Sequence, residues 1–142
     1  MNIVTGVTSR PESRAALDRA VEEAQLRGAT LHIVRTMGEG LSENPEKLAG
    51  WSRDLEAARQ EGDEVVAKLA ERGIDATYRV EPVERDAAST LLEVVEELDA
   101  ALLVIGLRRR SPVGKLVLGS VSQDVLLGAE CPVLAVKTDE GA

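Results

Sequence analysis

The chain contains almost no aromatic residues, one cysteine and one histidine. Aromatic residues make up 1% of the 142 residues, as Trp51, Tyr78 and no Phe, so Val, Leu, Ile and Ala must form the core. The aromatic platforms that stack the bases of single-stranded nucleic acid are therefore missing. Cys131 has no partner for an internal disulfide, which favours a reducing compartment. His32 alone excludes multi-histidine metal sites and completes no zinc site.

Long apolar runs are also lacking. The longest, residues 100–105, is far shorter than the roughly 20 residues that cross a bilayer, and the first ten residues show no signal-peptide pattern. The 17 Lys and Arg against 25 Asp and Glu give a net charge of −8 and a pI near 4.8. That charge repels nucleic acid and anionic membranes. We expect a cytoplasmic protein that binds neither nucleic acid nor a membrane.

Short β-type runs alternate with longer amphipathic segments along the whole chain. Strands are expected at residues 2–7, 31–35, 75–80, 101–105 and 133–136, and helices at 11–27, 48–69, 88–98 and 120–127. Pro11 suits a first helical position, and Gly28 suits a left-handed helix end. The βαβαβαβαβ order predicts one domain over residues 1–142, an α/β fold of three layers around a five-stranded parallel sheet. Its ligand crevice should lie beyond the carboxyl ends of the strands.

The stretch from Gly106 to Ser122 is the most informative, because it leads from an apolar strand through a basic loop into a helix. Gly106 lets the backbone leave the strand without a Cβ in the way. Gly119, Ser120 and Ser122 stand where the free N–H groups of the helix would face an anion. A structural alternative stays open, since Ser120 with Gln123 three residues later also matches a capping box.

Several of these residues resemble the universal stress protein family. The resemblance rests on Gly106, on Gly119-Ser120 at the matching distance, and on residues 130–134 entering the last strand; the helix start at residues 12–17 and the strand at 31–34 also fit. It covers essentially the whole chain. It implies a Rossmann-like α/β sandwich of the adenine nucleotide alpha hydrolase type. The nucleotide-binding branch carries a G-x-x-G-x9-G-[S/T] signature, which falls on Gly106, residue 109, Gly119 and Ser120.

The resemblance implies a set of ligand-binding residues and shows two departures from the family. The implied set is Thr8, Ile33, Ile105, Gly106, Arg109, Gly119, Ser120, Val121 and Ser122, with adenine against Ile33 and Ile105 and phosphates over the glycines and serines. Arg109 stands where the signature has its second glycine, and Thr8 where relatives often carry an acidic residue. The resemblance thus implies weak binding of ATP, with Mg²⁺ as its companion ion.

Arg108, Arg109, Arg110 and Lys115 form the one dense basic patch of an acidic chain. Guanidinium groups suit bidentate contacts with phosphate, so Arg109 could take over the role of the lost glycine. A solvated loop, or a patch that meets an acidic neighbour, explains the same residues equally well.

Other catalytic patterns fail. Gly114-Lys115 is followed by Leu116 and not by Ser or Thr, which excludes a P-loop. A Ser-His-Asp hydrolase would have to use His32, which lies in mid-strand, and the sequence contains no nucleophile-elbow motif. No general base lies near the signature, so an enzyme activity would be at most slow ATP hydrolysis. The resemblance therefore implies a stress-response module that weakly binds an adenine nucleotide at the loop after the fourth strand. The alternative is a homodimeric interaction or protective module that has lost nucleotide binding.

The last strand predicts how the chain assembles. Its apolar residues would leave an unpaired edge in a monomer, and such edges aggregate unless they are paired or covered. In the resembled family this strand often pairs with its twin across a two-fold axis, the isologous contact that homodimers prefer. We expect a homodimer through the residues from Val133 to Lys137.

Overall fold

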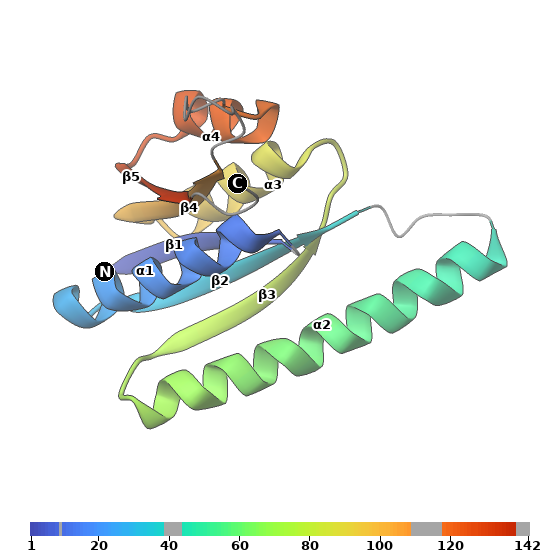
Figure 1. Ribbon diagram of the computed structural model, residues 1–142, viewed down its shortest axis with the longest axis horizontal. Coiled ribbons are helices and arrows are strands. Elements are labelled where there is room, and N and C mark those ends of the chain that lie inside the picture. The colour runs from blue at the N-terminus through green and yellow to red at the C-terminus, as the bar shows by residue number, and fades with distance from the viewer. Residues whose placement is uncertain (9, 39–43, 109–117, 139–142) are drawn as a thin grey trace.

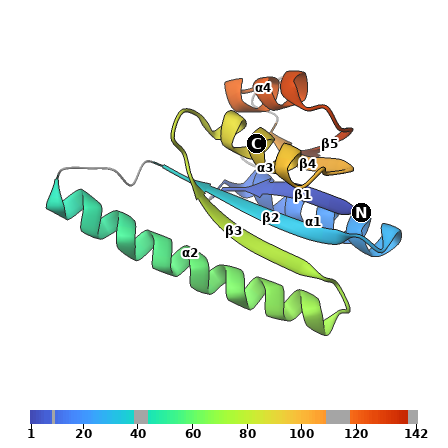
Figure 2. The ribbon, with the colours of Figure 1, turned by 180° about the vertical axis from the view of Figure 1, so that it is seen from behind.

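The computed structural model describes residues 1–8, 10–38, 44–108 and 118–138 (Figures 1 and 2). Its elements follow in strict alternation: β1 (Asn2–Val7), α1 (Pro11–Arg27), β2 (Thr30–Met37), α2 (Pro45–Glu71), β3 (Ala76–Pro82), α3 (Ala87–Glu97), β4 (Leu102–Arg108), α4 (Ser120–Gly128) and β5 (Val133–Thr138). The predicted order of elements and the α/β class are confirmed. Arg109, the other basic residues Arg110 and Lys115, and the tail at 139–142 lie outside the described residues.

The five strands form one parallel sheet in the order β3-β2-β1-β4-β5. The chain therefore moves outward from β1 in one direction through β2 and β3, and then in the other through β4 and β5. The strand order reverses between β1 and β4, which is where open α/β sheets bind their ligands. β3 and β5 are the edge strands of this sheet.

The sheet separates two apolar cores. One unites residues of α1 and α2 with side chains such as Ile3, Leu31 and Val104. The other unites residues of α3 and α4 with side chains such as Val4, Val34 and Leu103. Accordingly, α1 lies in front of the strands in Figure 1 and behind them in Figure 2. Figure 1 also shows α2 running along β3, with its first turns extending beyond the sheet.

Local sequence signals fix the helix ends. Pro11 opens α1 and Gly28 ends it in the left-handed conformation, at φ 61°, as predicted. The side chain of Asp86 begins α3 by accepting a hydrogen bond from the N–H of Ser89 at 2.7 Å. The strands extend past several predicted ends, and β4 continues to Arg108, so Gly106 lies inside a strand and does not lead out of it. Among the described residues, no helix is long and apolar enough to cross a membrane.

Candidate functional site

A cavity of about 200 Å³ lies at the carboxyl edge of the sheet, where the strand order reverses. The N-terminal ends of two helices and the end of β4 surround it. Its lining residues are Arg10, Glu12, Gly106, Leu107, Arg108, Gly119, Ser120, Val121 and Ser122. Five of the nine residues predicted from the sequence thus meet in one cavity, namely Gly106, Gly119, Ser120, Val121 and Ser122. The start of α1 contributes two residues that the sequence analysis missed, Glu12 in its first turn and Arg10 at its N-cap.

Gly106 allows β4 and the first turn of α1 to approach each other closely. A Cβ built on Gly106 would lie 2.2 Å from the backbone oxygen of Glu12 and 2.7 Å from its carbonyl carbon. Contacts this short cannot be relieved by turning a side chain, because both atoms belong to the backbone. The glycine is therefore required for packing, which differs from the exit role expected from the sequence.

The N-terminus of α4 supplies the cavity with hydrogen-bond donors. Its N-cap is Gly119, and the first helical bond runs from the N–H of Gln123 to the oxygen of Gly119. The N–H groups of the residues between them precede that bond and carry the positive end of the helix dipole. The capping-box interpretation of Ser120 is wrong: Ser120 is the first helical residue, and no side chain caps this helix. Its hydroxyl and that of Ser122 line the cavity instead.

Thr8 shapes the turn between β1 and α1 and does not line the cavity. Its Oγ1 accepts a hydrogen bond from the N–H of Arg10 at 3.1 Å and shares another with the hydroxyl of Ser13 at 2.9 Å. Its own N–H donates to the same Ser13 oxygen at 2.9 Å. These bonds tie Thr8 to the backbone of Arg10 and to the hydroxyl of Ser13, the residues on either side of Glu12 at the start of α1.

Ile33 and Ile105 lie on opposite faces of the sheet. Thr5 of β1 pairs with Ile33 on one side and with Val104 on the other, so Val104 shares a face with Ile33 and the next residue, Ile105, points the other way. Ile33 has no exposed surface and belongs to the core under α1 and α2, whereas Ile105 belongs to the core under α3 and α4. The expected apolar slot between them is therefore absent, and neither residue lines the cavity.

Two charged side chains at the cavity have polar atoms without a partner among the described residues. The Oε2 atom of Glu12 and the Nε atom of Arg108 are both buried and form no hydrogen bond with any described group. Glu12 as a whole is only 9% exposed. Nearly all buried polar groups in folded proteins are hydrogen-bonded, so each exception calls for an explanation. The sequence offered one signal for Glu12, an acidic residue in a first helical turn, but such residues are common where no ligand binds.

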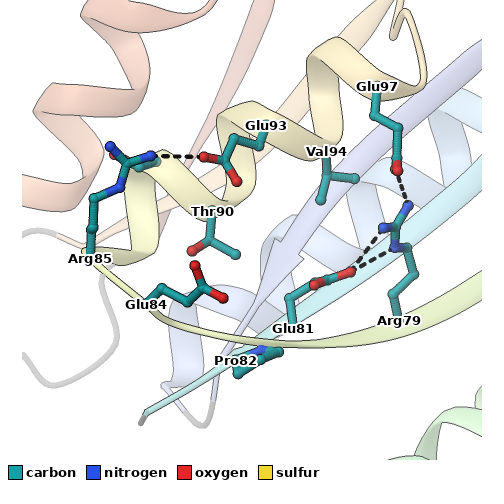
Figure 3. A pocket seen from close by; sticks show the side chains of 10 residues that line it. Arg79, Glu81, Pro82, Glu84, Arg85, Thr90, Glu93, Val94 and Glu97 are labelled. Atoms are coloured by element: carbon teal, nitrogen blue, oxygen red, sulfur yellow. Dashed lines mark hydrogen bonds and ion pairs between the residues drawn. The ribbon is translucent and has the colours of Figure 1, made fainter.

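A second polar cavity, of about 260 Å³, lies between β3 and α3. Figure 3 shows both of its arginines, Arg79 and Arg85, paired with glutamates. Arg79 binds the carboxylates of Glu81, at 2.9 Å, and Glu97, and Arg85 binds Glu93 at 3.0 Å. These cations already have counter-ions within the protein, so this groove holds its charges in surface ion pairs.

A third cavity, of about 500 Å³, lies between α3 and the end of α4 and includes Cys131. Burial raises the pKa of the Cys131 thiol, which keeps the thiol protonated and a poor nucleophile. Across the described parts of the chain, no group of three His, Cys, Asp or Glu side chains could hold a metal ion. Neither acid–base nor metal chemistry distinguishes this cavity.

The sheet order and the cavity between two helix N-termini define a doubly wound α/β domain with its crevice at the point where the strand order reverses. The model of the universal stress protein family matches residues 1–137. The chain belongs to the universal stress protein family. A universal stress protein of Mycolicibacterium smegmatis is 40% identical over 136 residues, which cover 95% of this chain and 96% of that protein. The chain spans about half the length of several other relatives that it matches.

Solved structures agree with the sequence comparison. A universal stress protein from Archaeoglobus fulgidus superimposes with a TM-score of 0.74 at 30% identity, covering 96% of this chain and 98% of that one. A universal stress protein from the same organism in complex with dAMP gives a TM-score of 0.69 at 25% identity, with the same coverage of 96% and 98%. At least one structural relative of this chain thus binds an adenine nucleotide.

Proposed function

We propose that this protein is a stress-response module that binds an adenine nucleotide, such as ATP, in the cavity between α1, β4 and α4. The observation that carries the proposal is the convergence of the α4 N-terminus, two serine hydroxyls and Arg108 on one cavity where the strand order reverses. The dAMP complex of a structural relative supports the same ligand class. The proposed setting is the cytoplasm, where the thiol of Cys131 stays reduced.

The phosphates are assigned to the N-terminus of α4. Three consecutive backbone N–H groups, from Ser120 to Ser122, are available there, and the helix dipole favours an anion at this end. Ser120 and Ser122 add hydroxyl donors. Because Ile33 is fully buried and Ile105 faces the opposite core, adenine binding between these two side chains is not part of the proposal.

Mg²⁺ bound with ATP would be held mainly by the phosphates, because this ion usually takes only one or two protein carboxylates. Glu12 is the one carboxylate among the described lining residues. The described residues supply no separate general base for water, so the proposed role is nucleotide binding, with hydrolysis no faster than a slow side reaction.

Titration calorimetry with ATP tests the proposal on the wild type, Gly119→Val and Leu127→Ala. No described atom lies within 4 Å of a Cβ at Gly119, so the valine is compatible with the described fold but occupies space at the cavity. We expect Gly119→Val to weaken binding about tenfold or more. Leu127 is 77% exposed on α4 and does not line the cavity, so its variant should bind like the wild type. Absence of ATP binding in the wild type would overturn the proposal and favour an interaction module without a nucleotide.

The effect of Arg109 on phosphate binding stays a separate prediction from the sequence. If its guanidinium holds phosphate, Arg109→Gly should weaken ATP binding and reduce its sensitivity to salt. If the side chain blocks the approach of phosphate, the same substitution should strengthen binding. Calorimetry at two salt concentrations distinguishes these outcomes.

We also propose a homodimer through β5. Within the described sheet β5 is an edge strand that pairs with β4 alone, and four of its side chains, from Val133 to Val136, are only partly buried. Pairing with a second β5 would cover this apolar edge. Light scattering at micromolar concentration should give twice the mass of the 15.2 kDa chain, and a monomer mass would overturn the dimer.

A further inference from the structure

Apolar and small residues form one stripe along the whole length of α2. They recur at alternating spacings of three and four residues, which places them on a single face of the helix. In the C-terminal half of α2 this face packs on β3, where Gly62 leaves no room for a Cβ beside the ring of Tyr78. The buried residues of that half are Ala58, Gly62 and Leu69. The fold thus covers the stripe from Ala58 onward.

Residues 45–57 of α2, here called the arm, carry the same stripe beyond the sheet (Figure 1). Leu48 is 45% exposed, Trp51 and Leu55 are partly exposed, and no residue of the arm is buried. Isolated helices shorter than about 12–15 residues are marginal in water, and Gly50 weakens this helix further. An uncovered apolar stripe on such a helix indicates an interaction surface.

The charges beside the stripe indicate which partner fits the arm. Lys47 and Asp54 each directly precede a leucine of the stripe, so both lie on the same flank. In the described part of the chain, neither of them forms an ion pair. They are two helical turns apart, about 10 Å, which is too far for them to pair within one arm. When two arms pack antiparallel, this flank faces its own copy, so Lys47 lies beside the partner's Asp54, and the pair occurs twice.

We propose that two copies of this chain associate through their arms, packed antiparallel around Trp51, the midpoint of the arm. The indole Nε1 of Trp51 already donates a hydrogen bond to the oxygen of Gly38 at 2.9 Å, so covering the ring leaves no polar group unsatisfied. A parallel pair is excluded, because the rest of the partner's helix would run into the sheet on which residues 58–69 pack. In the antiparallel pair each helix continues away from the sheet of the other copy.

The contact between the arms is separate from the dimer proposed through β5. The helix α2 packs on β3, and β3 and β5 are the two opposite edges of the sheet. Both contacts are isologous, so a chain that uses both assembles beyond a dimer. Standard interfaces take about 20–30 residues from each partner, more than one arm provides. We therefore expect weak association through the arms, between micromolar and millimolar concentration.

Tryptophan fluorescence of the full chain tests the proposal. Trp51 is the one tryptophan of the chain, so its emission reports on the arm, and pairing through β5 alone leaves it unchanged. We expect the emission to shift to shorter wavelength as the protein concentration rises from micromolar to millimolar, because the second arm excludes water from the indole. Leu48→Glu places a charge in the stripe and should abolish this shift. Constant emission of the wild type over the same range would overturn the proposal, even where light scattering finds a dimer.

A charge exchange tests the antiparallel arrangement. Lys47→Asp replaces both ion pairs by repulsions, so the shift should require about tenfold higher concentration. The new aspartate lies in the first turn of α2, where the helix dipole favours it, so the helix itself is not weakened. Lys47→Asp/Asp54→Lys restores opposite charges and should behave like the wild type. Lys68→Asp, in the last turn of α2, changes the net charge equally and is the matched control. A double variant no better than Lys47→Asp, or an equal loss in Lys68→Asp, would overturn the proposed pairing.

Discussion

The cavity at the reversal of strand order and the groove between β3 and α3 are similar in size but opposite in their use of charge. The groove, about 260 Å³, holds Arg79 and Arg85 in ion pairs with Glu81, Glu93 and Glu97. The cavity, about 200 Å³, leaves one polar atom each of Glu12 and Arg108 without a partner in the part of the chain that the structure describes. Arginine and glutamate thus pair with each other in the groove, whereas in the cavity each has a polar atom without a described partner.

This difference shows why the charge of a lining says little about whether it binds a ligand. Surface ion pairs contribute about 0–1 kcal/mol and occupy the groups that a ligand would need. Buried polar atoms without partners cost about 1–3 kcal/mol, which a bound ligand can recover. The smaller cavity is therefore the candidate site, and the larger groove is not.

The largest effect should follow from a substitution that disrupts the close contact between β4 and α1. Gly106→Ala would place a Cβ 2.2 Å from the Glu12 backbone oxygen, so α1 must move away from β4. We expect the free energy of unfolding to fall by about 3 kcal/mol, at the upper end for overpacked cores. Urea unfolding measures this. Gly119→Ala, at a position with nothing within 4 Å of its Cβ, should cost less than about 1 kcal/mol. Similar losses in both variants would contradict the assigned contact.

Two arginine substitutions, one in the cavity and one in the groove, test the comparison directly. Arg108→Met should weaken ATP binding about tenfold, through loss of a charged donor, while raising the stability of the free protein, because it removes a buried Nε that has no partner among the described residues. Arg79→Met should do the reverse, with unchanged ATP affinity and a stability loss below about 1 kcal/mol from its exposed ion pairs. Calorimetry and urea unfolding of both variants measure the two effects. Weaker ATP binding in Arg79→Met would contradict the comparison.

The sequence predicted the fold well because its signals are local. Strand runs, Pro11 at a helix start and Gly28 at a helix end act within a few residues, and each is confirmed. The pairing of Ile33 and Ile105 failed because the face of a side chain depends on strand register, and a shift of one residue reverses it. The register between β2, β1 and β4 arises from packing across the whole sheet.

The candidate site was half predicted for the same reason. Gly119, Ser120, Val121 and Ser122 are consecutive, so a local motif found them together. Arg10 and Glu12 reach the cavity from the start of α1, about a hundred residues earlier in the chain. Only the structure brings those segments together. It also separates Glu12, which has a buried oxygen without a described partner, from Glu23, which is equally buried but pairs with Arg19 and Arg27.

The smallest effect concerns His32, which lies near the groove side of the sheet. Burial, and then the charge of Arg79, lower the pKa of His32 below its usual 6.5. Its contribution to stability is therefore complete above pH 6.5 and is lost as the pH falls through the lowered pKa. His32 is the one histidine, so its ring resonance can be titrated by NMR without ambiguity. Arg79→Met should raise this pKa, and Arg85→Met should not. An unchanged pKa in Arg79→Met would contradict the assigned influence of the groove.

The most direct test of the account maps ATP onto the protein by NMR. Amide resonances of the ¹⁵N-labelled full chain are followed as ATP is added. The account predicts that the largest shifts occur at Gly106 and at the α4 N-terminus, from Gly119 to Ser122, with small shifts at Arg79, Ser89 and Glu97. The largest shifts in the groove between β3 and α3, or no shifts at millimolar ATP, would contradict the assignment of the nucleotide site.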